Sequence, residues 1–397
     1  MDKQEQNLIA LMDLAVNGRM QGVDQPDYPR LLTLARKHHV DNLLYHAVKK
    51  LPPPQQPQPQ FLGALRKLAY AAAARDALQE KESAQVLAAF DGAAVRVLPL
   101  KGSCLKRVYP SPEMRHMSDT DLLIAPSQAQ QAHRILEGLH FTEQHSNDES
   151  TDLYRSDSGF LLELHKSLVR EGANQAGRDY LAGLMDQAQP VSEGSAVLAL
   201  PHVEHYTYLI CHALKHFLGG GIGIRTILDL WLCRKHWAMD DTVLQERLRQ
   251  LGLEVFTARL EELGQVWFGD READEFTDSL GDYLFGSGAY GSFSNKAENL
   301  FLGRSGGNRF AYWRGRIFPP LKVMSGYFPV LKKCPILLPA FWFWRWIQAL
   351  TQRREKLKTE LRTVSAADEA QALCKREFYR QCGVLSLWLN GRGGQTD

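Results

Sequence analysis

The sequence predicts an α+β fold in which helical regions flank a mixed β-sheet. Three observations predict it. Apolar residues recur at helical spacing up to residue 92, short β-branched and alternating runs follow between residues 93 and 165, and helical spacing returns from Pro201. The chain has 397 residues, 44% hydrophobic and 23% charged, which fits two or three packed units and excludes a disordered or fibrous protein.

Residues 1–92 are expected to form an N-terminal helical region. Leu8, Leu11 and Met12 begin a series of apolar residues at helical spacing, and the Ala-rich and Leu-rich segment 60–90 predicts a long helix. The intervening run LPPPQQPQP, at residues 51–59, is typical of a stiff, exposed connector. None of these segments carries recognisable chemistry.

Residues 93–200 are expected to form the sheet-bearing core. Each predicted strand is a short run of β-branched or alternating apolar residues, and a helix is expected over residues 127–138. The predicted strands cover residues 93–100, 119–126, 139–145, 151–156 and 160–165.

The rest of the chain divides into a helical region, 201–300, and a basic, aromatic-rich region, 301–397. The helical region is interrupted by a Gly-rich link at 219–223 and by an expected small-residue loop at 283–295. The basic region carries 17 Lys and Arg against 6 Asp and Glu, whereas the preceding 300 residues carry 30 against 39. The sequence thus combines an acidic body with a basic tail.

No acidic residue occurs between Glu298 and Glu355, and aromatic residues are interleaved there with Arg and Lys. This composition suits an anionic membrane surface, and a nucleic acid is the less favoured partner. Internal packing of the aromatic rings against the acidic body is a further interpretation. The longest apolar run, Cys334 to Trp344, is shorter than the roughly 20 residues of a membrane span.

Asp119 and Asp121 lie two residues apart on a predicted strand, so both side chains leave the same face, opposite to Leu122 and Ile124. Two adjacent carboxylates repel each other unless a cation lies between them. Mg²⁺ suits such a pair because it prefers oxygen ligands and keeps positions open for phosphate oxygens. For an isolated pair, a solvated strand end is the simpler interpretation.

Two neighbouring features favour the metal interpretation. Gly102-Ser103 ends the first predicted strand and precedes a short helical stretch, so backbone N–H groups of the turn can bind phosphate. In the run 160–165, Glu163 and His165 share the face opposite to the apolar residues. A third carboxylate on a neighbouring strand completes a site for two metal ions.

The run LPLKGSCLKRVYPSPEMRHMSDTDLLI, followed by LLELH, resembles the uncharacterised bacterial nucleotidyltransferases of the DNA polymerase β-like superfamily. The resemblance covers most of the chain and is most specific between Lys101 and His165. It implies a nucleotidyltransferase core over residues 93–200, a divalent metal, Mg²⁺ or Mn²⁺, and an NTP substrate, for which ATP is the first expectation.

The resemblance also implies roles for individual residues. Gly102 and Ser103 would hold phosphate, Asp119 and Asp121 would be shared metal ligands, and Glu163 would ligate the catalytic metal and activate the acceptor. The interval between the Gly-Ser pair and Asp119 is longer than in minimal members of the superfamily. Lys101, Arg115 and His116 are also expected near the site. Arg115 either neutralises a phosphate or forms a salt bridge with a local acid.

Polar residues on the predicted helices of the 201–300 region are weaker signals. His205, His212 and His216 fall on one face, where they line a cleft or face solvent, and a zinc site is less favoured because there is no HExxH motif. Arg225 and Asp229 are four residues apart and are expected to form a surface ion pair.

The predicted function is metal-dependent transfer of a nucleoside monophosphate group from an NTP to an unidentified hydroxyl acceptor, with release of pyrophosphate. Two alternatives are a non-catalytic nucleotide-binding protein and a membrane-peripheral accessory of cell-envelope polysaccharide synthesis. Six dispersed cysteines without a CxxC motif, and a start unlike a signal peptide, predict a cytoplasmic protein, with a membrane-peripheral position as the open alternative. No motif specifies the oligomeric state.

Overall fold

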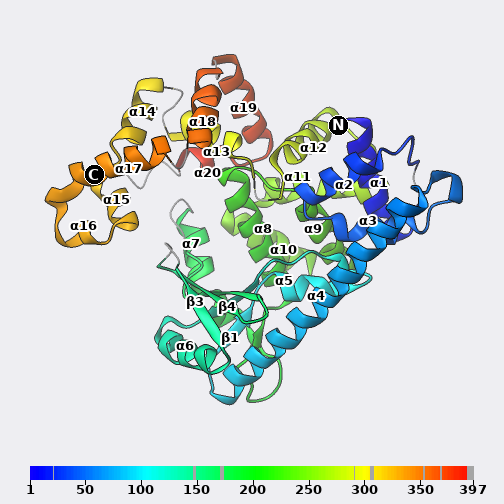
Figure 1. The fold of residues 1–397 in the computed structure, drawn as a ribbon, viewed down its shortest axis with the longest axis horizontal. Helices are drawn as coiled ribbons and strands as arrows, with labels where there is room; N and C mark the ends of the chain where they lie inside the picture. The colour runs from blue at the N-terminus through cyan, green and yellow to red at the C-terminus, as the bar shows by residue number, and fades with distance from the viewer. Residues whose placement is uncertain are drawn as a thin grey trace. The chain divides into compact units, whose positions relative to one another are not determined.

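Helices flank a mixed five-stranded sheet in the computed structural model, which confirms the predicted α+β fold (Figure 1). The structure describes residues 1–20, 22–145, 149–169, 174–289, 291–304, 308–351, 354–366 and 369–390. The chain divides into two units. The first comprises Met1–Arg170, Gln175–Ala213 and Gly223–Ala289, and the second comprises Glu171–Asn174, Leu214–Ile222 and Tyr290–Asp397.

The first unit begins with helices, as expected from the spacing of its apolar residues. A capping box formed by Asp2 and Glu5 caps the N-terminus of helix α1. Gly18 caps its C-terminus with a φ of 73°, which glycine readily adopts. The helices of this unit are α1 (Lys3–Asn17), α2 (Tyr28–Lys37), α3 (Asp41–Val48), η1 (Pro53–Gln55), α4 (Pro59–Gly92), α5 (Gly102–Leu105), η2 (Lys106–Val108), η3 (Pro112–Met114), η4 (Pro126–Gln128), α6 (Ala129–Gly138), α7 (Gln175–Ala182), η5 (Leu184–Gln187), α9 (Ile224–His236), α10 (Asp241–Leu251), α11 (Glu254–Phe268) and α12 (Glu275–Ser287).

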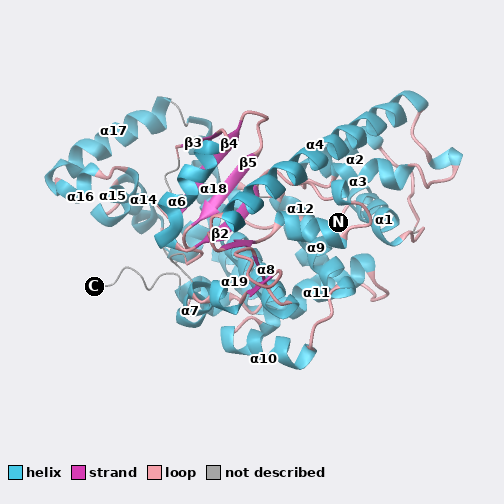
Figure 2. Cartoon of the chain, turned by 90° about the horizontal axis from the view of Figure 1, so that it is seen from below, coloured by secondary structure: helices cyan, strands magenta, loops and turns pink. Residues whose placement is uncertain are grey.

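The sheet has the strand order β1-β2-β5-β4-β3. Strand β2 runs parallel to β5, and the other neighbouring pairs are antiparallel. Figure 2 shows these strands together, with α4 as the longest neighbouring helix. The strands are β1 (Val97–Pro99), β2 (Thr120–Ile124), β3 (Phe141–Gln144), β4 (Thr151–Ser156) and β5 (Leu161–His165), and a small separate pair is formed by β6 (Gln189–Pro190) and β7 (Leu198–Ala199).

One face of the main sheet forms a hydrophobic core with α4 and α6. Phe90 of α4 and Leu136 of α6 pack there with Leu122 of β2 and with Leu162 and Leu164 of β5. The side chains of a strand alternate between faces, so Asp121, Glu163 and His165 lie on the opposite face of the sheet. The core therefore fixes the direction in which the candidate site residues point.

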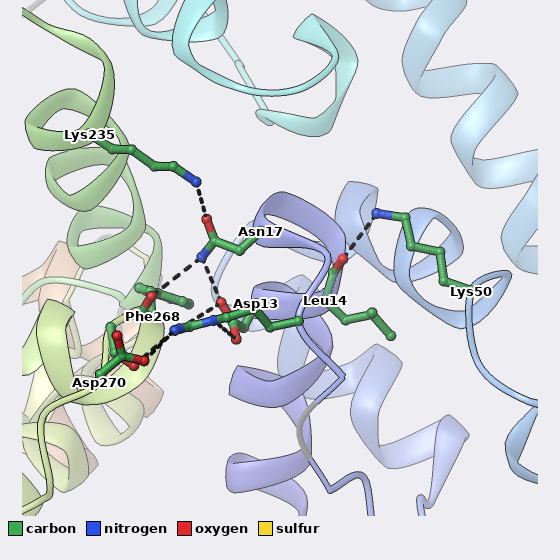
Figure 3. A network of polar contacts seen from close by, with 9 residues as sticks. Asp13, Leu14, Asn17, Lys50, Lys235, Phe268 and Asp270 are labelled. Atoms are coloured by element: carbon green, nitrogen blue, oxygen red, sulfur yellow. Dashed lines mark hydrogen bonds and ion pairs between the residues drawn. The ribbon is translucent and has the colours of Figure 1, made fainter.

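A polar network attaches the N-terminal helices to the later helices of the first unit (Figure 3). The buried carboxylate of Asp13 accepts hydrogen bonds from Asn17 at 2.6 Å and from Arg19 at 3.0 Å. Lys235 of α9 donates to Asn17 at 2.7 Å, and Arg19 also donates to Asp270, just after α11. A buried carboxylate must keep its hydrogen-bond donors, so these contacts fix the position of the N-terminal helices against α9 and the end of α11.

Two predicted boundaries were wrong. The first strand covers only Val97–Pro99, because α4 continues to Gly92 and Ala94 then turns the chain with a φ of 54°. The expected loop at 283–295 is shorter, since α12 continues to Ser287 and α13 begins at Phe293. Small residues within an otherwise amphipathic run did not end the helix there.

The second unit is helical in the described residues. Helix α8 (His202–Gly219) places its first residues in the first unit and its last residues in the second, where Phe217 contacts the rings of Phe378 and Tyr379. The other helices are α13 (Phe293–Asn299), η6 (Leu300–Arg304), α14 (Arg309–Ile317), α15 (Leu321–Tyr327), α16 (Val330–Lys333), η7 (Pro335–Leu337), α17 (Leu338–Thr351), α18 (Arg354–Ala366), α19 (Glu369–Gln381) and α20 (Leu385–Asn390). Among the described residues, no helix combines the length and apolar character needed to cross a membrane.

Candidate active site

Asp121 and Glu163 are direct neighbours across the two parallel strands of the sheet. The register pairs Asp121 of β2 with Glu163 of β5 and Leu123 with His165. The alternation predicted for residues 160–165 is confirmed, because Leu162 and Leu164 enter the core while the polar residues lie on the other face. Two carboxylates from distant parts of the chain are thereby held side by side.

His165 joins the two acids in one cluster. Its Nε2 lies 3.0 Å from Oδ1 of Asp121 and 3.5 Å from Oε2 of Glu163, and its Nδ1 lies 3.0 Å from Oγ1 of Thr151 on β4. One potential ligand atom from each of Asp121, Glu163 and His165 lies within 4.8 Å of the others, a spacing that could hold a metal ion. Carboxylate oxygens suit Mg²⁺ and Mn²⁺, and the imidazole suits the transition metal better.

Lys101 supplies a positive charge to this cluster from the end of β1. Its Nζ lies 2.9 Å from Oδ1 of Asp121 and 3.1 Å from Nε2 of His212 on α8. The backbone explains the approach, since the Leu100 N–H donates to the Asp121 carbonyl at 3.0 Å. The turn that follows β1 therefore starts beside Asp121.

The two acids have opposite electrostatic surroundings. Burial raises the pKa of Asp121, but the Lys101 ammonium and the His165 hydrogen bond outweigh it and hold that pKa below its ordinary value. Burial also raises the pKa of Glu163, and the negative charges of Asp121 and Asp119 raise it further. Asp121 is therefore the better permanent anion, and Glu163 the better proton acceptor.

Asp119 lies immediately before β2, and its Oδ1 accepts a hydrogen bond from Ser118 at 2.9 Å. It does not belong to the group of potential ligand atoms formed by the described residues Asp121, Glu163 and His165. Its charge still reaches Glu163, whose pKa it raises. Burial and Arg225 lower the pKa of His39, and the negative charge of Asp119 partly offsets this effect. Asp119 therefore flanks the cluster.

Gly102 and Ser103 form the start of the short helix α5. A Cβ at Gly102 would lie 2.5 Å from Sδ of Met117 and 2.8 Å from its Cγ, so a larger residue requires Met117 to move. Met117 belongs to the segment that leads into Asp119. The glycine thus allows the turn after β1 to pack tightly against the segment entering β2.

Arg115 is buried and binds Asp229 of α9. Its Nε donates to Oδ1 at 2.8 Å and its Nη2 to Oδ2 at 2.9 Å, and the Tyr109 hydroxyl donates to Oδ1 at 2.8 Å. These contacts match the salt-bridge alternative, with an acid 114 residues away in the chain. We therefore leave Arg115 out of the proposed phosphate contacts. Asp229, expected beside Arg225, has Arg115 as its bidentate partner.

Two of the histidines on one face of α8 contact the residues that directly follow β1. His205 is buried and its Nε2 donates to the Leu100 carbonyl at 2.8 Å, while His212 contacts Lys101. Burial lowers the pKa of His205 to about 4, with the Leu100 carbonyl partly opposing this effect. Of the two alternatives for these histidines, lining a cleft or facing solvent, the second is wrong for His205, whose neutral ring anchors α8 beside β1.

Sequence reasoning gave His165 no role in the site and left His212 as one of three histidines that line a cleft or face solvent. His165 could have been included, because it shares a strand face with Glu163 and stands two residues away. No local signal relates His212 to Lys101, since 111 residues separate them. The contact between Lys101 and Asp121 likewise depends on how β1 and β2 pair.

Comparison with protein families shows a match over much of the chain. The model of a family described as uncharacterised nucleotidyltransferase matches residues 24–269, which include the sheet, the carboxylate cluster and the helices from α2 to α11. Comparison with curated proteins gives no match.

Proposed function

We propose, from the premise that the chain belongs to the uncharacterised nucleotidyltransferase family, that it transfers a nucleoside monophosphate group from an NTP to a hydroxyl acceptor. One observation carries the proposal. The carboxylates of Asp121 and Glu163 and the imidazole of His165 converge on one face of the sheet, with potential ligand atoms within 4.8 Å of one another. Phosphoryl-group chemistry needs such a site, because a divalent cation must offset the charge of the phosphates.

The donor set fits a divalent metal. Asp121 and Glu163 would hold Mg²⁺ or Mn²⁺, with Asp119 as a further carboxylate at the edge of the cluster. Such a metal, when bound, supplies positive charge for the phosphates and favours ionisation of a bound hydroxyl. In the structure the Lys101 ammonium supplies positive charge 2.9 Å from Asp121, and His165 forms a hydrogen bond with the same carboxylate at 3.0 Å. Lys101 is then available to turn from Asp121 to a phosphate, beside Gly102 and Ser103.

The reaction exchanges one bond of the α-phosphorus for another. The acceptor oxygen forms a bond to the α-phosphorus, the bond from that phosphorus to the bridging oxygen of the β-phosphate breaks, and pyrophosphate leaves. Glu163 takes the proton of the acceptor hydroxyl, a role supported by its raised pKa. ATP is the first nucleotide to test.

Two substitutions test the proposal in the presence of each NTP, Mg²⁺ or Mn²⁺, and a cell extract as the source of acceptor. We expect Asp121→Asn to reduce labelling of the acceptor by about 10²-fold or more, because a neutral amide holds a divalent cation poorly. We expect Glu163→Gln to reduce the transfer rate much more than it weakens NTP binding. Asp157→Asn, an exposed acid in the turn between β4 and β5, is the matched control.

Full transfer activity in both variants would overturn the assignment of these acids. NTP binding by the wild type without any transfer would instead favour the non-catalytic nucleotide-binding alternative.

A further inference from the structure

One face of helix α17 contacts the segment 317–319 of the second unit. The indole N–H groups of Trp342 and Trp346 donate to the carbonyls of Pro319 and Ile317, each at 2.9 Å. The ring of Phe318 meets both indoles edge-on, with centroids 5.3 and 5.5 Å away. These contacts fix the rotation of α17 about its axis, because two rings one helical turn apart are both bound to the same segment.

The opposite face of α17 is apolar and exposed. The exposed fractions are 62% for Phe343, 53% for Trp344, 41% for Ile347 and 63% for Leu350. Their spacing of one, three and three residues places them along one side of the helix. Ile336, in η7 just before α17, is 87% exposed. Scattered apolar residues are normal on protein surfaces, whereas such a continuous stripe indicates a binding partner.

The chain segment that carries this stripe is positively charged. No Asp or Glu occurs between Glu298 and Glu355. Lys332 and Lys333 of α16 are exposed, as is Lys322 of α15. Helices α15, α16 and α17 lie beside one another (Figure 1), and η7 connects α16 to α17. The partner should therefore be negatively charged and should also accept large apolar side chains.

We propose that α15–α17, residues 321–351, dock the protein on an anionic lipid bilayer, with α17 lying in the plane of the membrane surface. At 1.5 Å per residue its 14 residues span roughly 21 Å, less than the hydrocarbon thickness of about 30 Å. The stripe enters the boundary between headgroups and acyl chains, and the lysines contact anionic headgroups. A second copy of the chain would instead bring like charges together, and a nucleic acid offers no apolar medium for Ile336 and Leu350.

Co-flotation of the full chain with lipid vesicles tests this docking surface without nucleotide or metal. We expect binding to equimolar phosphatidylcholine and phosphatidylglycerol, little binding to phosphatidylcholine alone, and weakening by salt as the Debye length falls below about 10 Å. Phe343→Ser with Trp344→Ser should weaken binding by roughly tenfold or more and leave its salt dependence in place. Lys332→Gln with Lys333→Gln should reduce the salt dependence.

Matched controls separate docking from folding. Tyr70→Ser removes an equally exposed aromatic ring from α4 and should leave vesicle binding unchanged. Trp342→Ala removes an inward-facing ring, so we expect it to lower thermal stability. The serine variants of the exposed stripe should melt like the wild type.

Three outcomes would overturn the proposal. The first is a wild type that ignores anionic vesicles at low salt. The second is a wild-type dimer that the Phe343→Ser and Trp344→Ser changes convert to monomer, without any vesicle binding. The third is single-stranded RNA binding that these two changes abolish while vesicles remain unbound.

Discussion

At the scale of single residues, the site separates two carboxylates that are chemically alike. Asp121 receives a hydrogen bond from His165 and an ion pair from Lys101, while Glu163 faces the negative charges of Asp121 and Asp119. One strand register therefore produces an acid that stays ionised and an acid that accepts protons more readily. This difference follows from the neighbours of each side chain.

Glu163→Gln should stabilise the metal-free protein at neutral pH. A carboxyl group whose pKa is raised by folding costs stability when it ionises, so the glutamine removes a cost that exists above the folded pKa. We expect a gain of less than about 1 kcal/mol, because Glu163 is one-third exposed and therefore screened by solvent. Urea unfolding with a chelator at about pH 7.5 measures it. The gain should vanish below the ordinary glutamate pKa of about 4.3, and a variant less stable than wild type at neutral pH would contradict this account.

Arg115→Lys should destabilise the protein without changing its affinity for NTP. Lysine cannot make both hydrogen bonds to the buried Asp229, so we expect a loss of about 3 kcal/mol in the free energy of unfolding. Arg107→Lys, an exposed change in the same segment, should have little effect. A stable Arg115→Lys protein with weakened NTP binding would show instead that Arg115 contacts phosphate.

The residues that could be predicted are those whose relation is local. Glu163 and His165 share a face because side chains alternate along a strand, and Leu122 and Ile124 were correctly assigned to the core for the same reason. The pairing of Arg115 with Asp229 and of Lys101 with Asp121 depends on tertiary structure. No short-range pattern in the sequence encodes these contacts.

At the scale of elements, the turn after β1 is the part on which the candidate site depends most. Gly102→Ala should destabilise the protein by about 1–3 kcal/mol, because the new Cβ overlaps the side chain of Met117. Adding Met117→Ala should recover part of this loss, since it removes the overlapping atoms. Thermal unfolding of the single and double variants measures the coupling.

Gly138→Ala is the matched control for this prediction, because no atom beyond its chain neighbours and its own helix backbone lies within 4 Å of a Cβ built there, and φ is not positive. If the double variant were no more stable than Gly102→Ala, contact with Met117 would not be the reason for the glycine.

The long, strongly patterned elements were predictable, and their arrangement was not. Helix α4 was expected over 60–90 and covers Pro59–Gly92. The strand order β1-β2-β5-β4-β3, by contrast, places β5 beside β2 although two strands intervene in the sequence. Periodicity identifies which face of an element is buried, and it does not identify the neighbouring element.

At the scale of the whole molecule, α8 is shared between the two units. Its His205 and His212 contact the residues that directly follow β1 in the first unit, and its Phe217 packs with Phe378 and Tyr379 in the second. The first part of α8 is therefore held by polar contacts in the first unit, and its last part by ring contacts in the second.

Tyr379→Ala should loosen the end of α8 that lies in the second unit. The change leaves a cavity beside Phe217 and removes the hydrogen bond from the Tyr379 hydroxyl to Asn299, so we expect a loss of about 3–5 kcal/mol in that unit. Hydrogen exchange should accelerate at residues 214–219 more than at residues 203–210. Tyr327→Ala, at an exposed ring, is the control. Equal acceleration along the whole of α8 would contradict a division of the helix between two units.

The position of the transferred label tests the central claim most directly. Purified protein is incubated with a cell extract, Mg²⁺ or Mn²⁺, and ATP labelled either at the α-phosphate or at the γ-phosphate, with Asp121→Asn in parallel. We expect the α-label alone to enter the acceptor, the γ-label to appear in pyrophosphate, and both signals to require the metal and Asp121. Entry of the γ-label into the acceptor would show phosphoryl transfer, and it would contradict nucleotidyl transfer at this site.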